Sequence, residues 1–170
     1  MSQTADRLAE LGIVLPKPAA PVANYVPFVM TGGPLTTPGA GTGKHALLWV
    51  SGQLPFGRDG KLAERHAGKL GPDSPIEAAR EAARLCAINV IAQAQAAVGD
   101  LDWIVRVVRL GGFFNIAGSF DPLPQAMNGA SDLMAEVFAE RGKHARTTVG
   151  VAHLPMNALC EVEAQFEISV

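Results

Sequence analysis

Cysteine is scarce in this sequence, and a long hydrophobic run is missing. Only two of the 170 residues are cysteine. Cys86 and Cys160 stand among apolar neighbours, which is typical of reduced, buried thiols. No apolar run approaches the roughly 20 residues that a membrane-spanning helix needs, and the first residues lack a basic region followed by an apolar one. We therefore expect a cytoplasmic protein that does not contact membranes.

An excess of charge of either sign is also missing. The 14 basic and 16 acidic residues give a formal net charge of -2, which provides no broad basic surface for nucleic acid. The four histidines show no metal-binding spacing. The glycine-rich segment 39–44 departs from a phosphate-binding loop, because Pro38 and His45 stand where glycine and serine or threonine are required. The sequence therefore predicts no nucleic-acid partner, no metal and no nucleotide cofactor.

Hydrophobic residues make up 48% of the chain, enough to build the core of one domain. We expect an N-terminal helical arm and proline-rich linker over residues 1–22, then one α+β domain over residues 23–170. Residues 32–44, rich in glycine, proline and threonine, are predicted to form an extended loop. The predicted elements are, in order, a short helix (4–11), two strands (25–31 and 45–53), a long helix (74–99), a strand (103–114), a second helix (121–142) and two strands (146–152 and 160–168).

This order of elements predicts an α+β fold, because it contains too few crossover helices for a doubly wound sheet. Two helices can cover only one face of the sheet. The other face would carry Arg146, Thr148, Glu161 and Glu163, and an uncovered sheet face of mixed character is a candidate subunit interface. We therefore expect an oligomer.

The last two predicted strands carry the most informative pattern. In residues 160–168 small and apolar side chains alternate with Glu161, Glu163 and other polar side chains, as the two-residue period of a strand requires. A turn at about 153–157 would make the two strands an antiparallel hairpin and place Arg146 and Thr148 on the same face as Glu161 and Glu163. Taken alone, such an arrangement favours an ordinary cross-strand ion pair over a site that binds a carboxylate.

Three motifs resemble the Rid family of reactive-intermediate deaminases, also called the YjgF family. The strongest is ARTTVGVAHLP at 145–155 together with EVEA at 161–164, which is similar to the closing signature of that family. SGQLP at 51–55 matches a second motif, and Tyr25 occupies the place of an early tyrosine. Asn128 is a looser match.

The resemblance implies a chorismate-mutase-like subunit that assembles as a homotrimer with clefts between subunits. Family members with the arginine hydrolyse enamine or imine acids such as 2-aminoacrylate to a 2-keto acid and ammonia, without a cofactor. By this resemblance Arg146 would bind the substrate carboxylate, Glu161 would handle the water and its proton, and Tyr25 would border the pocket. The backbone near Gly52 and Thr148 would add hydrogen bonds.

Two other functions stay open at this stage. The same cleft would serve a protein that binds or senses a keto acid without turnover. Some family members carry an endoribonuclease label, but the acidic balance and the absence of a basic stripe argue against RNA as a substrate.

Overall fold

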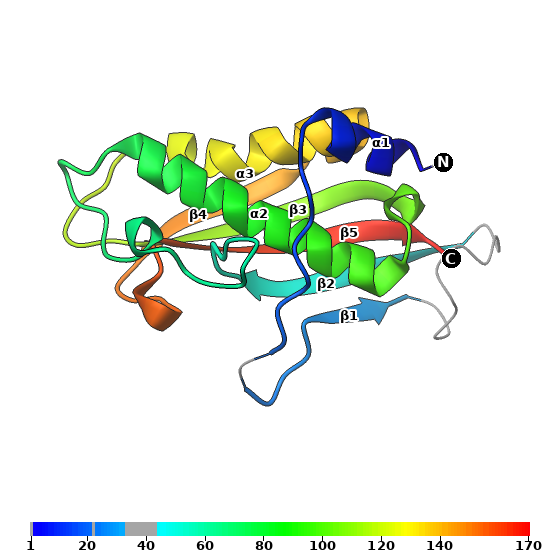
Figure 1. The fold of residues 1–170 in the computed structure, drawn as a ribbon, viewed down its shortest axis with the longest axis horizontal. Helices are drawn as coiled ribbons and strands as arrows, with labels where there is room; N and C mark the ends of the chain where they lie inside the picture. The colour runs from blue at the N-terminus through cyan, green and yellow to red at the C-terminus, as the bar shows by residue number, and fades with distance from the viewer. Residues whose placement is uncertain (1, 22, 33–43) are drawn as a thin grey trace.

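The computed structural model describes residues 2–21, 23–32 and 44–170, and its centre is one five-stranded sheet (Figure 1). The strands lie in the order β1-β2-β5-β3-β4, and all neighbours are antiparallel except β3 and β4, which are parallel. The strands are β1 (Phe28–Thr31), β2 (His45–Gln53), β3 (Ile104–Asn115), β4 (Ala145–Val151) and β5 (Cys160–Ser169). The predicted α+β class with a mixed sheet is confirmed.

Two long helices lie side by side across one face of the sheet (Figure 1). They are α2 (Ile76–Val98) and α3 (Leu123–Phe138), and a short helix, α1 (Gln3–Glu10), packs at one end of α3. Four 3₁₀ turns complete the described elements, namely η1 (Glu64–His66), η2 (Leu101–Trp103), η3 (Ala139–Gly142) and η4 (Pro155–Asn157). The prediction that the helices cover one face is thus confirmed, whereas the predicted loop falls almost wholly on residues 33–43, which lie outside the described residues.

The predicted hairpin between the last two strands is wrong. β4 pairs with β3 in parallel, and β3 separates β4 from β5. Parallel strands need a long crossover connection, and α3 supplies it between β3 and β4. The following segment, 152–159, then passes β3 to reach β5. A two-residue period reveals which side chains share a face, but it does not reveal which strand is the neighbour.

The core lies between the sheet and the two helices. Side chains from the alternate positions of β5 are buried there, including Val162, Phe166 and Ile168. Cys86 on α2 and Cys160 on β5 are buried free thiols, as predicted, and burial raises the pKa of Cys86. In the described ranges, no helix combines the length and the apolar composition needed to traverse a bilayer.

Asp102 ties the N-terminal helix to the domain. Its carboxylate accepts hydrogen bonds from the Gln3 amide at 2.7 Å and from the Thr4 amide and hydroxyl at 2.9 and 2.6 Å. Burial by itself raises the pKa of this carboxyl, but the hydrogen bonds from Thr4 and Gln3 outweigh it and lower the pKa to about 2. Arg141 adds a hydrogen bond to the Thr4 hydroxyl at 3.1 Å. The first turn of α1 is therefore fixed to the segment before β3.

This anchor predicts a pH-dependent contribution to stability. Because the pKa of Asp102 is lower in the folded state, its contribution is present at neutral pH and is lost as the pH falls from about 4 towards about 2. We expect Asp102→Asn to lower the free energy of unfolding by about 1–2 kcal/mol at pH 7 and by much less at pH 2.5, measured by denaturant titration. Asp73→Asn, at an exposed carboxylate before α2, is the control and should have little effect. An equal loss at both pH values would contradict the role of the charge.

Candidate functional site

The predicted site residues form two groups at separate places on the subunit. Tyr25, Gly52 and Glu161 line one cavity, which we call the acid pocket. Asn128, Arg146 and Thr148 lie on α3 and β4, and we call this group the arginine cluster. The structure thus brings each set of three together but keeps the two sets apart within one chain.

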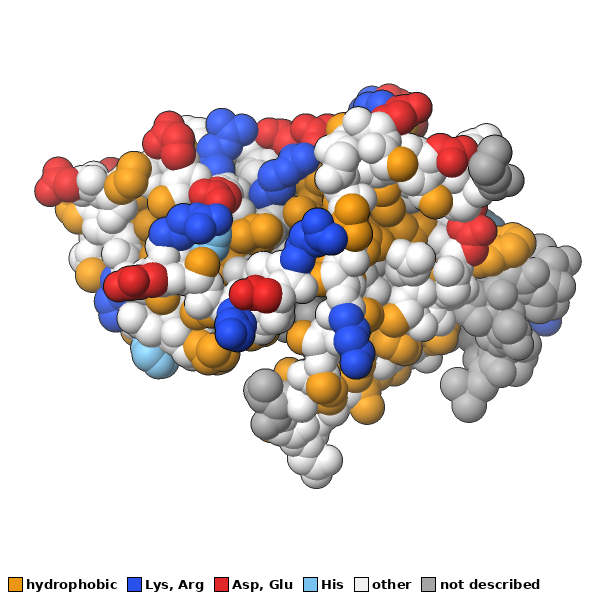
Figure 2. Space-filling view, in the orientation of Figure 1, with side chains coloured by type: hydrophobic (Ala, Val, Ile, Leu, Met, Phe, Trp, Pro, Cys, Tyr) orange, Lys and Arg blue, Asp and Glu red, His pale blue; other side chains and the backbone are white. Residues whose placement is uncertain are grey.

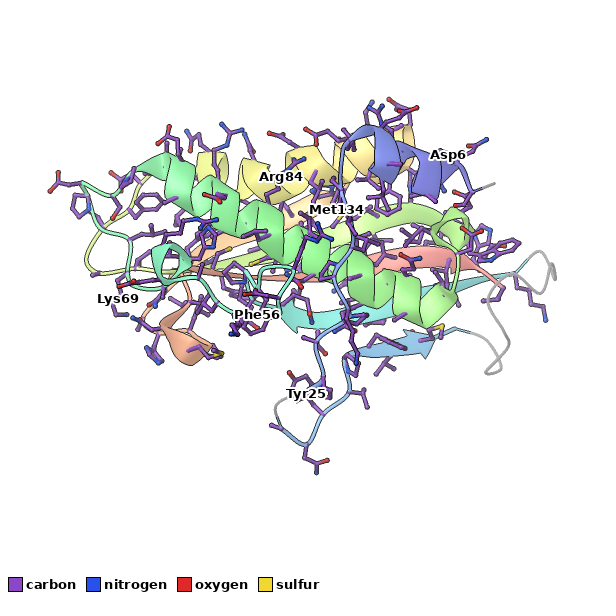
Figure 3. All side chains as sticks on the ribbon, viewed as in Figure 1. Asp6, Tyr25, Phe56, Lys69, Arg84 and Met134 are labelled. Atoms are coloured by element: carbon purple, nitrogen blue, oxygen red, sulfur yellow. The ribbon has the colours of Figure 1, made fainter. Side chains whose placement is uncertain are left out.

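The acid pocket has a volume of about 200 Å³ and lies beside the ends of β2 and β5. Tyr25 comes from the loop before β1 and Phe56 from the segment after β2; both are labelled in Figure 3. Glu161, near the start of β5, is the only charged residue among the described residues that line this pocket. The pocket is therefore mainly apolar, and its polar side chains are one carboxylate, the hydroxyl of Tyr25 and the amides of Gln53 and Gln93.

Gly52 allows the Glu161 carboxylate to lie against the backbone of β2. A Cβ atom at position 52 would overlap the Oε1 atom of Glu161 and lie 2.7 Å from its Cδ. The register of β2 and β5 shifts between Val50 and Gln53, so a bulge turns the backbone at this point. Glycine is required at position 52 because any other side chain would displace the carboxylate.

Glu161 is held in an environment that disfavours its charge. Burial raises the pKa of this carboxyl, and the nearby charge of Glu163 raises it further. Glu163 is itself paired with Arg109, with the Nη1 and Oε1 atoms 3.2 Å apart. A half-buried carboxyl with a raised pKa is well suited to accept and return a proton near neutral pH.

Arg146 is fixed against α3 by acceptors that carry no charge. Its Nη1 donates to Asn128 Oδ1 at 2.8 Å and to Ser131 Oγ at 3.0 Å, and its Nη2 donates to the Pro124 carbonyl at 3.0 Å. No carboxylate of the described residues lies within 4.0 Å of this guanidinium. These contacts use three of the five N–H donors, so two donors and the whole positive charge remain for an anion. Thr148, on the same strand face, has a buried hydroxyl without a hydrogen-bond partner among the described residues.

His144, in the short segment between η3 and β4, supports this arrangement. Its Nδ1 lies 2.6 Å from the Gly142 carbonyl, so this nitrogen carries the proton, and Nε2 accepts from the Ser131 hydroxyl at 3.0 Å. Burial lowers the pKa of His144, and the charge of Arg146 lowers it further. The neutral imidazole thereby leaves the Ser131 oxygen free to accept from Arg146.

Arg146 and Glu161 point to opposite sides of the sheet, which corrects the predicted shared face. Arg146 is paired with Leu110, whose side chain is in the core beneath the helices. Glu161 is paired with Phe113, on the face that the helices leave open. The two residues therefore form no ion pair within one chain. The cross-strand ion pair of the open face is instead the one between Arg109 and Glu163.

The open face carries exposed apolar side chains beside these charges. Val29 and Trp49, on the paired strands β1 and β2, are 48% and 45% exposed. Val149 on β4 is 39% exposed. A mixed surface of this kind agrees with the predicted subunit interface.

The close approach at Gly52 makes a measurable prediction. We expect Glu161 to titrate above the ordinary value of 4.5 and Gly52→Ala to move its pKa back down, because the added methyl pushes the carboxylate towards water. NMR titration of carbon-13-labelled glutamate side chains measures this shift. Gly71→Ala is the matched control, since a Cβ atom there meets its nearest neighbour at an ordinary 3.6 Å. An unchanged Glu161 titration in Gly52→Ala would contradict the proposed contact.

Comparisons with known proteins agree with the sequence motifs. The family described as "YjgF/chorismate mutase-like, putative endoribonuclease" matches residues 5–168, further towards the N-terminus than the motifs that begin at Tyr25. The chain is 43% identical over 168 residues to Protein TCP17 of Trypanosoma cruzi, with 98% of this chain and 95% of that protein covered.

Solved structures show the same fold. The protein Atu1372 of Agrobacterium tumefaciens, of unknown function, is 43% identical with a TM-score of 0.80 and covers 98% of this chain and 94% of its own. A Shewanella oneidensis protein described as a putative endoribonuclease is 35% identical with a TM-score of 0.84, at 97% and 99% coverage. Escherichia coli TdcF with bound serine, 18% identical with a TM-score of 0.57 and covering 91% and 94%, shares the fold alone.

Proposed function

Since this chain belongs to the YjgF/chorismate mutase-like (Rid) family, we propose that it hydrolyses small enamine or imine acids to a 2-keto acid and ammonia. The reaction would take place in clefts between the subunits of a homotrimer, with Arg146 and Glu161 as the catalytic pair. The bound substrate would also contact four further residues, namely Tyr25, Gly52, Asn128 and Thr148.

The observation that carries this proposal is the state of Arg146. Three neutral acceptors hold its guanidinium in one place, and no carboxylate of the described residues neutralises it. Several other arginines of the described residues do have a carboxylate partner, as Arg84 has in Glu136 and Arg141 has in Asp102. A positioned but uncompensated guanidinium is suited to bind the carboxylate of a small acid at two points.

A second subunit would complete the site. Within one chain the arginine cluster lies on the helical side of β4 and the acid pocket opens beside β2 and β5, so one substrate cannot touch both. In a cyclic oligomer each subunit would present its arginine cluster to the acid pocket of its neighbour. The serine bound to TdcF, also a small molecule with a carboxylate, supports this class of ligand.

The chemistry needs only these two groups and water. With the carboxylate bound to Arg146, the electrophilic imine carbon would lie beside Glu161. Glu161 would take one proton from water as its oxygen attacks that carbon and pass it to the imine nitrogen, which gives a carbinolamine. It would then pass the remaining hydroxyl proton to the same nitrogen as the carbon–nitrogen bond breaks, so that the hydroxyl oxygen becomes the keto oxygen and ammonia leaves. An enamine substrate first gains a proton at its terminal carbon and loses one from its nitrogen to become the imine. The raised pKa of Glu161 favours both directions of proton transfer.

Removal of the guanidinium tests the substrate contact. We expect Arg146→Ala to reduce kcat/KM for 2-aminoacrylate at least about 100-fold, because a charged two-point contact contributes several kcal/mol. Ammonia release with the unstable substrate generated in place measures the loss. Arg80→Ala, at an exposed arginine on α2 that pairs with Asp132, should retain activity. Full activity in a folded Arg146→Ala trimer would refute the proposal.

Mixed oligomers test whether the two groups come from different chains. Arg146→Ala and Glu161→Gln are each expected to be inactive alone. In trimers assembled at random from equal amounts of both, about a quarter of the clefts would pair an intact arginine cluster with an intact acid pocket, and activity would return to about that level. No recovery in verified mixed trimers would place the complete site within one chain and contradict the cleft.

Binding without turnover is the alternative that uses the same contacts. Arg146 alone suffices to hold a keto acid, and Glu161 would then serve no chemical step. RNA is disfavoured as a substrate: Figure 2 shows acidic and basic side chains interspersed over the helical face rather than one basic patch. Keto-acid affinity combined with imine hydrolysis no faster than in buffer would favour the binding protein.

A further inference from the structure

The N-terminal arm forms part of the wall of the acid pocket. Residues 19–21 line the cavity on one side, and Leu54, Phe56 and Met156 line it elsewhere. From this wall we propose that the preferred substrate is an imine acid with a bulky apolar side chain, such as one derived from leucine or phenylalanine. This inference rests on the proposed function and specifies its substrate class.

Two buried amide side chains fix the arm relative to the reacting groups. Gln93 on α2 is 2% exposed and donates from Nε2 to the Ala19 carbonyl at 2.8 Å and to Gln53 Oε1 at 3.4 Å. Gln53 in turn donates to the backbone carbonyls of Ser51 and Gly52, at 2.9 and 3.0 Å. Because Gly52 is the backbone against which Glu161 lies, this chain of hydrogen bonds sets the distance between the arm and the carboxylate.

The size of the cavity exceeds what the smallest substrates require. Its volume of about 200 Å³ exceeds the roughly 150 Å³ of an apolar cavity that is large enough to bind benzene. A bound 2-aminoacrylate has no side chain beyond its methylene group, so much of the cavity beside it would remain filled with water. A branched or aromatic side chain would displace that water and bury its own apolar surface.

The lining also selects against charged side chains. Among the described residues that line the cavity, Glu161 is the only one with a charge, and it is needed for the proton transfers. A second carboxylate on the substrate would be repelled by Glu161. An ammonium group would pair with Glu161 and take it away from the water. The second carboxylate would also lose its hydration against the apolar wall without a positively charged partner among the described lining residues.

A substrate series tests the inference directly. Imines are generated in place by an amino-acid oxidase from alanine, leucine, phenylalanine and glutamate, and keto-acid release is followed. We expect kcat/KM for the leucine or phenylalanine imine to exceed that for the alanine imine at least tenfold, since each buried methylene contributes roughly fourfold. The glutamate imine should be the poorest substrate.

Substitutions in the wall connect the preference to this cavity. Ala20→Phe should fill the cavity and raise KM for the leucine imine about tenfold or more, by a larger factor than it raises KM for the alanine imine. Val14→Phe, at an exposed arm residue outside the pocket, is the control. If Ala20→Phe disturbs folding or assembly, Met156→Ala removes wall area contributed by the η4 turn and should weaken the preference for the leucine imine.

The outcomes separate this inference from the function on which it rests. Imine hydrolysis with equal efficiency for all side chains, or with a preference for alanine, would overturn the inference and leave the function intact. If no imine is hydrolysed, the function fails. Calorimetric binding then tests whether the apolar wall selects its ligand. Tighter binding of 4-methyl-2-oxopentanoate than of pyruvate, with the difference abolished by Ala20→Phe, would support the apolar wall. Equal binding of the two keto acids would overturn it.

Discussion

The parallel pairing of β3 with β4 determines where every functional group lies. It places β4 at the edge of the sheet and beneath α3, so that Arg146 meets neutral acceptors on that helix. It also leaves β5 in the interior of the sheet between β2 and β3, where Glu161 can reach the backbone of Gly52. An antiparallel hairpin would have joined the two charges directly and neutralised both.

Because Arg146 and Glu161 lie apart within one subunit, each keeps the charge state that the proposed reaction needs. The guanidinium retains its charge without a carboxylate partner among the described residues, and the raised pKa of Glu161 reflects burial without a cation beside it. Each state costs some stability in the isolated subunit, because a free charge or a desolvated carboxyl has no compensating contact. A bound substrate would supply the anion that Arg146 lacks.

Much of the fold was predictable because its signals are local. The alternation along β5 correctly identified the buried face, and the long helix predicted over residues 74–99 corresponds to α2 (Ile76–Val98). The partner of β4 was not predictable, because the same pattern fits an antiparallel hairpin and a parallel pair joined by a crossover helix. Pairing across β3 depends on contacts far apart in the sequence, which a periodic pattern does not record.

The same distinction between local signals and contacts far apart in the sequence explains which residues of the candidate site were predicted. Gly52 and Asn128 were identified by family motifs, since nothing local reveals that position 52 faces a carboxylate from another strand. Ser131, which accepts from Arg146, was missed, although it lies three residues after Asn128 and therefore on the same face of α3. The contribution of the arm to the acid pocket depends on Gln93, whose polar side chain gave no sign of its buried partner.

The buried link from Gln93 to Ala19 has an evolutionary consequence. The arm is joined to the pocket through a backbone carbonyl, and this contact does not depend on which side chains the arm carries. The side chains of residues 19–21 can therefore be substituted during evolution while the sheet, Arg146 and Glu161 stay unchanged. Such a segment is a modular element, and a few point mutations in it could change which metabolites the members of a lineage accept as substrates.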